Sequence, residues 1–135
     1  MDCLLGVMFN QQTKIIMDSK FYVSLKTARL LKEKGYNEET VHYYNSAGKL
    51  YLGDGHFNYN AYAANISAPT KAEAIDWLEG KEIVIEINSV RNRRWRFSLY
   101  KLGKFYIDSW VHDRLDFSTR LEAEDAAIIK ALEML

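Results

Sequence analysis

The chain has 135 residues, enough for one domain with a hydrophobic core and short for two. Its 18 basic and 18 acidic residues balance, which argues against a globally basic protein drawn to nucleic acid or anionic membranes. Cys3 is the only cysteine, which excludes an internal disulfide and a cysteine-based zinc site and favours a reducing compartment. No stretch is apolar over a bilayer's thickness, so we expect a cytoplasmic protein without a membrane partner.

Residues 1–18 have an apolar start, a polar middle and no capping residue before the first apolar run. We interpret them as an N-terminal extension and expect residues 19–135 to form a single domain. Ser24 is a good N-cap for a helix with Leu25, Ala28 and Leu31 on one face. Two β-prone runs, 41–44 and 49–52, then flank a turn with Gly48 in its positive-φ position, which predicts a hairpin.

Residues 53–67 are rich in Gly, Asn and Tyr and show neither helical nor strand periodicity. We expect a long loop here, and long loops in compact domains are often functional. Thr70 and Glu73 have capping-box spacing and predict a helix that ends at Gly80 as its left-handed residue.

Three strands are predicted after that helix. Ile83, Ile85 and Ile87 share one face of the first strand, with Glu82, Val84 and Glu86 on the other. Beyond a polar turn, Trp95, Phe97 and Leu99 alternate with mostly polar residues. The third strand begins near residue 105, with Ser109 expected on one of its faces.

Thr119 and Glu122 repeat the capping-box spacing before a final helix with an apolar face. The face consists of Leu121, Ala127, Ile128, Ala131, Leu132 and Leu135. The predicted fold class is α+β: an antiparallel sheet with helices packed mainly on one face, and a C-terminal half ordered α-β-β-β-α.

The order of these segments resembles a group of small proteins of anaerobic gut bacteria and their phages or mobile elements. The matching stretches are 21–25, 30–36, 43–44, 49–50, 67–70, 74–78 and 126–135. The group has no assigned activity, so the resemblance implies a cytoplasmic, mobile-element setting and transfers no functional residue.

In topology the C-terminal half also resembles a double-stranded-RNA-binding domain, with similar alanine spacing in the last helix. Where that family has lysines at the helix start to meet phosphates, this sequence has Glu122, Glu124 and Asp125, with Arg120 as the basic residue. The resemblance therefore implies the topology rather than the function.

The first candidate site is a set of aromatic residues among Asn, Gly and Ser, a composition suited to protein recognition. The expected partner-binding residues are Tyr43, Tyr44, Phe57, Tyr59 and Tyr62, with Tyr51 nearby. The alternative is that half of these rings face the sheet and the others pack over it. Exposure of Tyr59 and Tyr62 in one patch would discriminate between the two interpretations.

The second candidate is an arginine-rich hairpin within residues 81–120, which hold nine basic and five acidic residues. Guanidinium groups and an exposed tryptophan can contact phosphates and bases. The residues concerned are Arg91, Arg93, Arg94, Trp95 and Arg96. The alternative is a solvated hairpin whose tryptophan points into the core.

His42, His56 and His112 lack the close spacing of metal ligands, and no nucleophile or phosphate-binding motif occurs. We therefore expect no catalytic residue, metal or cofactor. The predicted function is that of a small non-enzymatic binding or accessory protein that contacts a protein or a second copy of itself. The alternative is a weak nucleic-acid-binding domain that uses the arginine hairpin.

Overall fold

The structure, a computed structural model, describes residues 19–101 and 105–135. Within these residues the helices are α2 (Leu25–Glu33), α3 (Lys71–Gly80), α4 (Ser109–Asp113) and α5 (Arg120–Glu133). The strands are β1 (Thr40–Tyr44), β2 (Leu50–Phe57), β3 (Ile66–Ser67), β4 (Ile83–Val90), β5 (Arg94–Lys101) and β6 (Phe105–Asp108). Single 3-10 turns lie at Ser19–Phe21, Tyr59–Ala61 and Arg91–Arg93.

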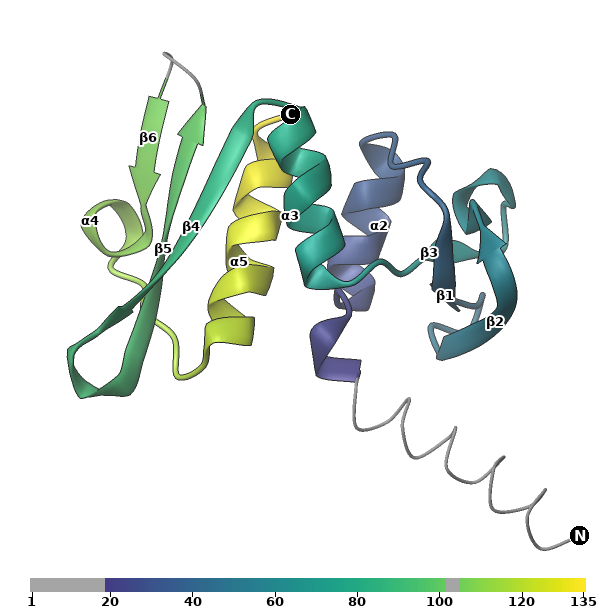
Figure 1. Cartoon of the computed structure of the whole chain (residues 1–135), viewed down its shortest axis with the longest axis horizontal. Helices are drawn as coiled ribbons and strands as arrows, with labels where there is room; N and C mark the ends of the chain where they lie inside the picture. The colour runs from purple at the N-terminus through teal and green to yellow at the C-terminus, as the bar shows by residue number, and fades with distance from the viewer. Residues whose placement is uncertain (1–18, 102–104) are drawn as a thin grey trace, which may run out of the picture.

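The antiparallel α+β fold class is confirmed, with its strands divided between two sheets (Figure 1). The N-terminal sheet has the order β2-β1-β3 and the C-terminal sheet the order β4-β5-β6, and α2, α3 and α5 lie between them. Helices α3 and α5 contact the C-terminal sheet, whereas α2 contacts α5 and β3. The expected extension at residues 1–18 lies outside the described residues.

One cluster of buried apolar side chains joins this helical layer to both sheets. Tyr44 enters the cluster from β1, and Phe97 and Leu99 enter it from β5. The apolar face predicted for the last helix is present, with Ile128 and Leu132 fully buried, although Leu135 is exposed beyond the helix end. Helix α5 therefore supplies a large part of the shared core.

The two predicted hairpins are confirmed by the strand registers. Tyr43 pairs with Tyr51 across the turn in which Gly48 has a φ of 80°. In the C-terminal sheet, Ile83 to Val90 pair without interruption with Arg94 to Lys101, and β6 adds the third strand. The third strand ends at Asp108, because the Asp108 carboxylate accepts hydrogen bonds from the amides of Trp110 and Val111 and caps α4. Ser109 is therefore helical, not part of the strand as expected.

The predicted helix starts are confirmed as well. The Ser24 hydroxyl accepts from the Thr27 amide, and Thr70 and Glu73 form a reciprocal capping box. Helix α3 ends at Gly80 as predicted, but Gly80 is not left-handed, because the positive φ falls on Glu82, at 67°. The chain reverses there to bring the next residue, Ile83, into the core.

The prediction of a long loop over residues 53–67 is also wrong. Strand β2 continues to Phe57, and a 3-10 turn and β3 follow it. Thr40 pairs with Phe57 and His42 with Leu52, so four residues of β2 lie opposite the single residue Val41. Such a bulge disrupts regular alternation, which explains why the sequence shows no strand periodicity here.

None of the described helices has the length and apolar character that crossing a membrane requires.

Candidate functional site

Stacked aromatic rings cover the face of the N-terminal sheet that points away from the helices. Tyr44 directs its hydroxyl to the Val23 carbonyl in the core, 2.7 Å away, so its strand neighbour Tyr43 faces the opposite side. The Tyr43 ring stacks on Tyr59 with centroids 4.5 Å apart and on Tyr51 with centroids 6.0 Å apart. We call Tyr43, Tyr51, Phe57, Tyr59 and Tyr62 the aromatic surface.

A glycine in β2 makes room for the central ring of this surface. A Cβ at Gly53 would collide with the Tyr59 side chain and lie 2.8 Å from the Val41 carbonyl oxygen. The Tyr59 hydroxyl passes over this glycine and donates to the Gly55 carbonyl at 3.0 Å. Burial raises the pKa of Tyr59, and the neighbouring Tyr43, Asp54 and Tyr62 add to that rise.

Polar contacts fix the segment that carries Tyr62. The Asn60 side chain donates to the Tyr36 carbonyl at 2.8 Å and accepts from the Ser67 amide at 2.8 Å. The Lys32 ammonium on α2 donates to the carbonyls of Tyr62 and Asn65 at 3.0 and 2.8 Å. The backbone beneath Tyr62 is therefore tied to the helical layer, while its ring is 59% exposed.

The predicted aromatic residues divide between the core and the surface. Tyr44 and Tyr59 are buried, so neither offers a ring face for a partner, and Tyr59 and Tyr62 are not exposed together. Phe57 is 51% exposed, and Tyr51, which the predicted partner-binding set leaves out, is exposed as well. The pairing of Tyr51 with Tyr43 across the hairpin is the sequence signal that would have added it.

Two of the hairpin arginines are engaged within the protein. Arg94 forms an ion pair with Asp116 at 2.6 Å, and its hydrogen bond to that carboxylate holds the pKa of Asp116 below the usual range. The Arg96 guanidinium lies 4.2 Å from the Trp110 ring centroid. Trp95 is half-buried, and the Arg120 guanidinium lies 5.7 Å from its ring centroid.

The other two arginines, Arg91 and Arg93, are exposed in the 3-10 turn at the hairpin tip. Among the described residues, ion pairs engage Arg94 but neither of these two. The hairpin thus presents two accessible guanidinium groups rather than the predicted set of four and a tryptophan.

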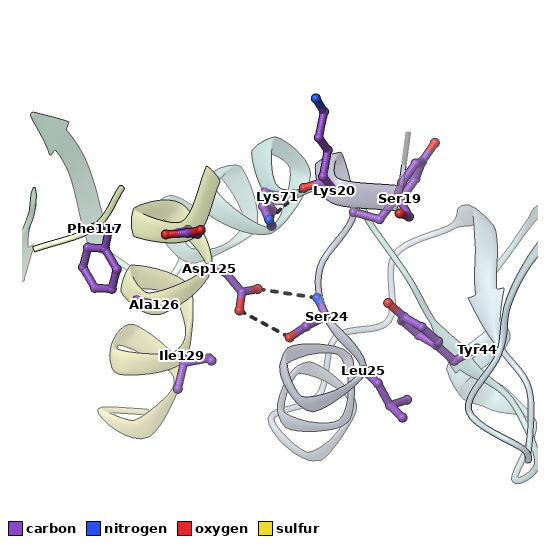
Figure 2. Close-up of a pocket in the computed structure, with 12 residues that line it drawn as sticks. Ser19, Lys20, Ser24, Leu25, Tyr44, Lys71, Phe117, Asp125, Ala126 and Ile129 are labelled. Atoms are coloured by element: carbon purple, nitrogen blue, oxygen red, sulfur yellow. Dashed lines mark hydrogen bonds between the residues drawn. The ribbon is translucent and has the colours of Figure 1, made fainter. Parts of the chain in front are cut away.

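A cavity of about 680 Å³ lies between the start of α2 and the first half of α5 (Figure 2). Asp125 on α5 accepts from the Ser24 amide at 3.5 Å, from the Ser24 hydroxyl at 3.3 Å and from the Thr27 hydroxyl at 3.0 Å. The Lys71 ammonium donates to the Lys20 carbonyl at 2.7 Å. Burial lowers the pKa of Lys71, and nearby carboxylates, Asp125 foremost, oppose that shift.

Asp125 therefore connects α5 to the start of α2, and Lys71 connects α3 to the 3-10 turn Ser19–Phe21. The Ser24 hydroxyl lines this cavity and donates to the Asp125 carboxylate, and no histidine is among the lining residues to act as its base. The lining consists of Ser19, Lys20, Tyr22, Ser24, Leu25, Tyr44, Lys71, Phe117, Glu122, Asp125, Ala126 and Ile129.

The histidines are distributed over two places. His42 and His56 line a smaller cavity of about 200 Å³ together with Glu73, whose carboxylate is bonded to Thr70. His112 lies on α4, where its ring contacts the backbone of Asp108. Across residues 19–101 and 105–135, no group of three His, Cys, Asp or Glu side chains is arranged to hold a metal ion.

Comparison of the chain with models of protein families, with curated proteins and with solved structures gives no match.

Proposed function

We propose that this protein acts by binding another protein chain through the aromatic surface of its N-terminal sheet, as a small non-enzymatic binding or accessory protein. The observation that carries the proposal is that Tyr51, Phe57 and Tyr62 are exposed over a rigid stack formed by Tyr43 and Tyr59. Aromatic side chains on a fixed backbone bury much area at a low cost in conformational entropy, and they are enriched at protein interfaces.

The proposed location is the cytoplasm, which suits a chain with one cysteine.

The test is site-specific photo-crosslinking in a cell extract. A photoreactive phenylalanine analogue replaces Tyr62 in one variant and Val111 on α4, a residue 64% exposed, in the control. We expect crosslinked products from position 62, either with another protein or with a second copy, and few from position 111. Phe57→Ser should reduce the products at position 62, because it removes apolar contact area next to the stack. Equal crosslinking from the two positions would contradict the proposal.

Nucleic-acid binding at the hairpin tip is a second candidate, supported by the exposure of Arg91 and Arg93. Phosphate contacts of this kind weaken steeply as salt rises, because binding releases counterions. A salt titration with single- and double-stranded RNA and DNA tests it, with Arg91→Ala/Arg93→Ala as the variant that leaves the Arg94–Asp116 ion pair intact. If binding is absent at low salt, or is unchanged in the double variant, this candidate is eliminated.

A further inference from the structure

Strand β2 is a sheet edge without the prolines and basic side chains that commonly protect edges from pairing with other chains. Within the described residues, β1 is its only strand neighbour. Leu50–Phe57 contains no Pro, Lys or Arg, and its exposed large apolar side chains are Tyr51, Leu52 and Phe57. An edge of this composition is a template for an added strand.

The middle of β2 has more backbone groups than β1 can pair. Gly53, Asp54, Gly55 and His56 lie opposite Val41 alone, because the register shifts between Thr40 and His42. The Gly55 carbonyl accepts a hydrogen bond from the Tyr59 hydroxyl. Because the backbone groups of successive residues in a strand point to opposite edges, a strand added at Asp54 and His56 would not compete with this bond. Unpaired backbone groups in an extended segment favour an external partner.

The polar side chains of this segment are self-complementary around Gly55. In an antiparallel pair centred on Gly55, Asp54 lies opposite His56 of the partner subunit, and the contact occurs twice by symmetry. A register centred on Asp54 places two aspartates opposite each other, and one centred on His56 places two histidines opposite each other. Two facing aspartates repel each other, whereas an imidazole N–H can donate a hydrogen bond to a facing carboxylate, so the Gly55 register is favoured over the register with two facing aspartates.

We propose that β2 pairs antiparallel with β2 of a second copy of this chain, centred on Gly55, so that the two N-terminal sheets become one continuous sheet. Asp54 exchanges backbone hydrogen bonds with His56 of the partner subunit, while Gly55 faces its copy as a non-hydrogen-bonded pair. The inference rests on the proposed function, because it uses the sheet that carries the aromatic surface, and it names the partner as a second copy.

The other long edge strand, β4, fits this role less well. Its isoleucines at positions 83, 85 and 87 face the helical layer, where Ile83 is buried and the other two pack against the core. Its exposed residues are Glu86, Asn88 and Ser89. Strand β4 therefore exposes no large apolar side chain.

Sedimentation analysis of the full chain tests whether Asp54 and His56 of two copies face each other in a dimer. We expect a concentration-dependent dimer that His56→Asp weakens by about tenfold or more, because aspartates then face each other at two symmetric positions. Asp54→Lys combined with His56→Asp should restore the dimer, because opposite charges face each other again. Asn88→Asp, which adds one negative charge on β4, is the matched control and should leave it unchanged.

A disulfide tests the register directly. In a Cys3→Ser background, Gly55→Cys places two thiols opposite each other in a non-hydrogen-bonded pair, at a separation that a disulfide can bridge after a small adjustment. We expect oxidation to give a covalent dimer with Gly55→Cys and not with Asn88→Cys on β4.

The pairing is overturned if the wild-type chain is monomeric at all concentrations, or if its dimer neither responds to His56→Asp nor forms the Gly55→Cys disulfide. A monomeric chain that still crosslinks to another protein at position 62 would overturn the pairing and leave the proposed function standing. If position 62 yields no crosslink of either kind and the chain is monomeric, both are overturned.

Discussion

Glu82 has a left-handed backbone conformation, with φ at 67°, that side chains with a Cβ adopt at a steric cost. Its side chain is exposed and the turn leads directly into buried Ile83. We predict that Glu82→Gly raises the free energy of unfolding by about 1 kcal/mol, the relief of strain exceeding the entropy that glycine adds to the unfolded chain. Urea denaturation measures the change.

Glu82→Ala is the control for this prediction, because it removes the charged side chain and keeps the Cβ. A similar gain in both variants would mean that the loss of the carboxylate, not the backbone conformation, causes the stabilisation.

For single residues, the sequence predicts those interactions whose partners lie close together along the chain. The caps at Ser24 and Thr70 were predictable because donor and acceptor lie within three residues of each other. The ion pair of Arg94 with Asp116 joins residues 22 apart in the sequence. It forms because the segment after α4 brings Asp116 beside β5. Nothing local distinguishes this arginine from the exposed Arg93.

At the scale of elements, hydrophobic periodicity predicted each strand of the C-terminal sheet because the pairing of β4 with β5 is uninterrupted. It failed in β2, where the bulge opposite Val41 breaks the alternation and Gly53 accommodates a ring instead of a side chain of its own. Part of the candidate site therefore lies in the segment that the sequence presents as a loop.

Helix α5 offers a quantitative test at this scale. Leu132 is fully buried among residues of the shared core, so Leu132→Ala removes apolar contacts and leaves a cavity. We predict a loss of about 2 to 5 kcal/mol in the free energy of unfolding. Leu135→Ala, at an exposed residue beyond the helix end, should cost far less. Chemical denaturation of both variants measures the difference, and equal losses would contradict the burial pattern.

At the scale of the whole molecule, the sequence does not reveal that the strands form two sheets. Each hairpin is specified locally, but which hairpins join depends on contacts between distant segments. The same limit applies to the tyrosines: Tyr43 and Tyr44 are adjacent in sequence, yet one faces the aromatic surface and the other the core. Alternate residues of a strand point to opposite faces of the sheet, but only the fold determines which of the two faces is buried.

Asp125 connects the two halves of the molecule, because its carboxylate on α5 holds the first turn of α2 through Ser24 and Thr27. Asp125→Ala leaves the fully buried Thr27 without this charged acceptor, and we predict a loss of about 1.5 to 3 kcal/mol in the free energy of unfolding. Because one core joins both sheets, far-UV circular dichroism and tryptophan fluorescence should still report a single, coincident transition at a lower midpoint. Glu133→Ala, at an exposed residue on the same helix, should change the midpoint little. Two separate transitions in the Asp125→Ala variant would show that the sheets unfold independently and would contradict the shared core.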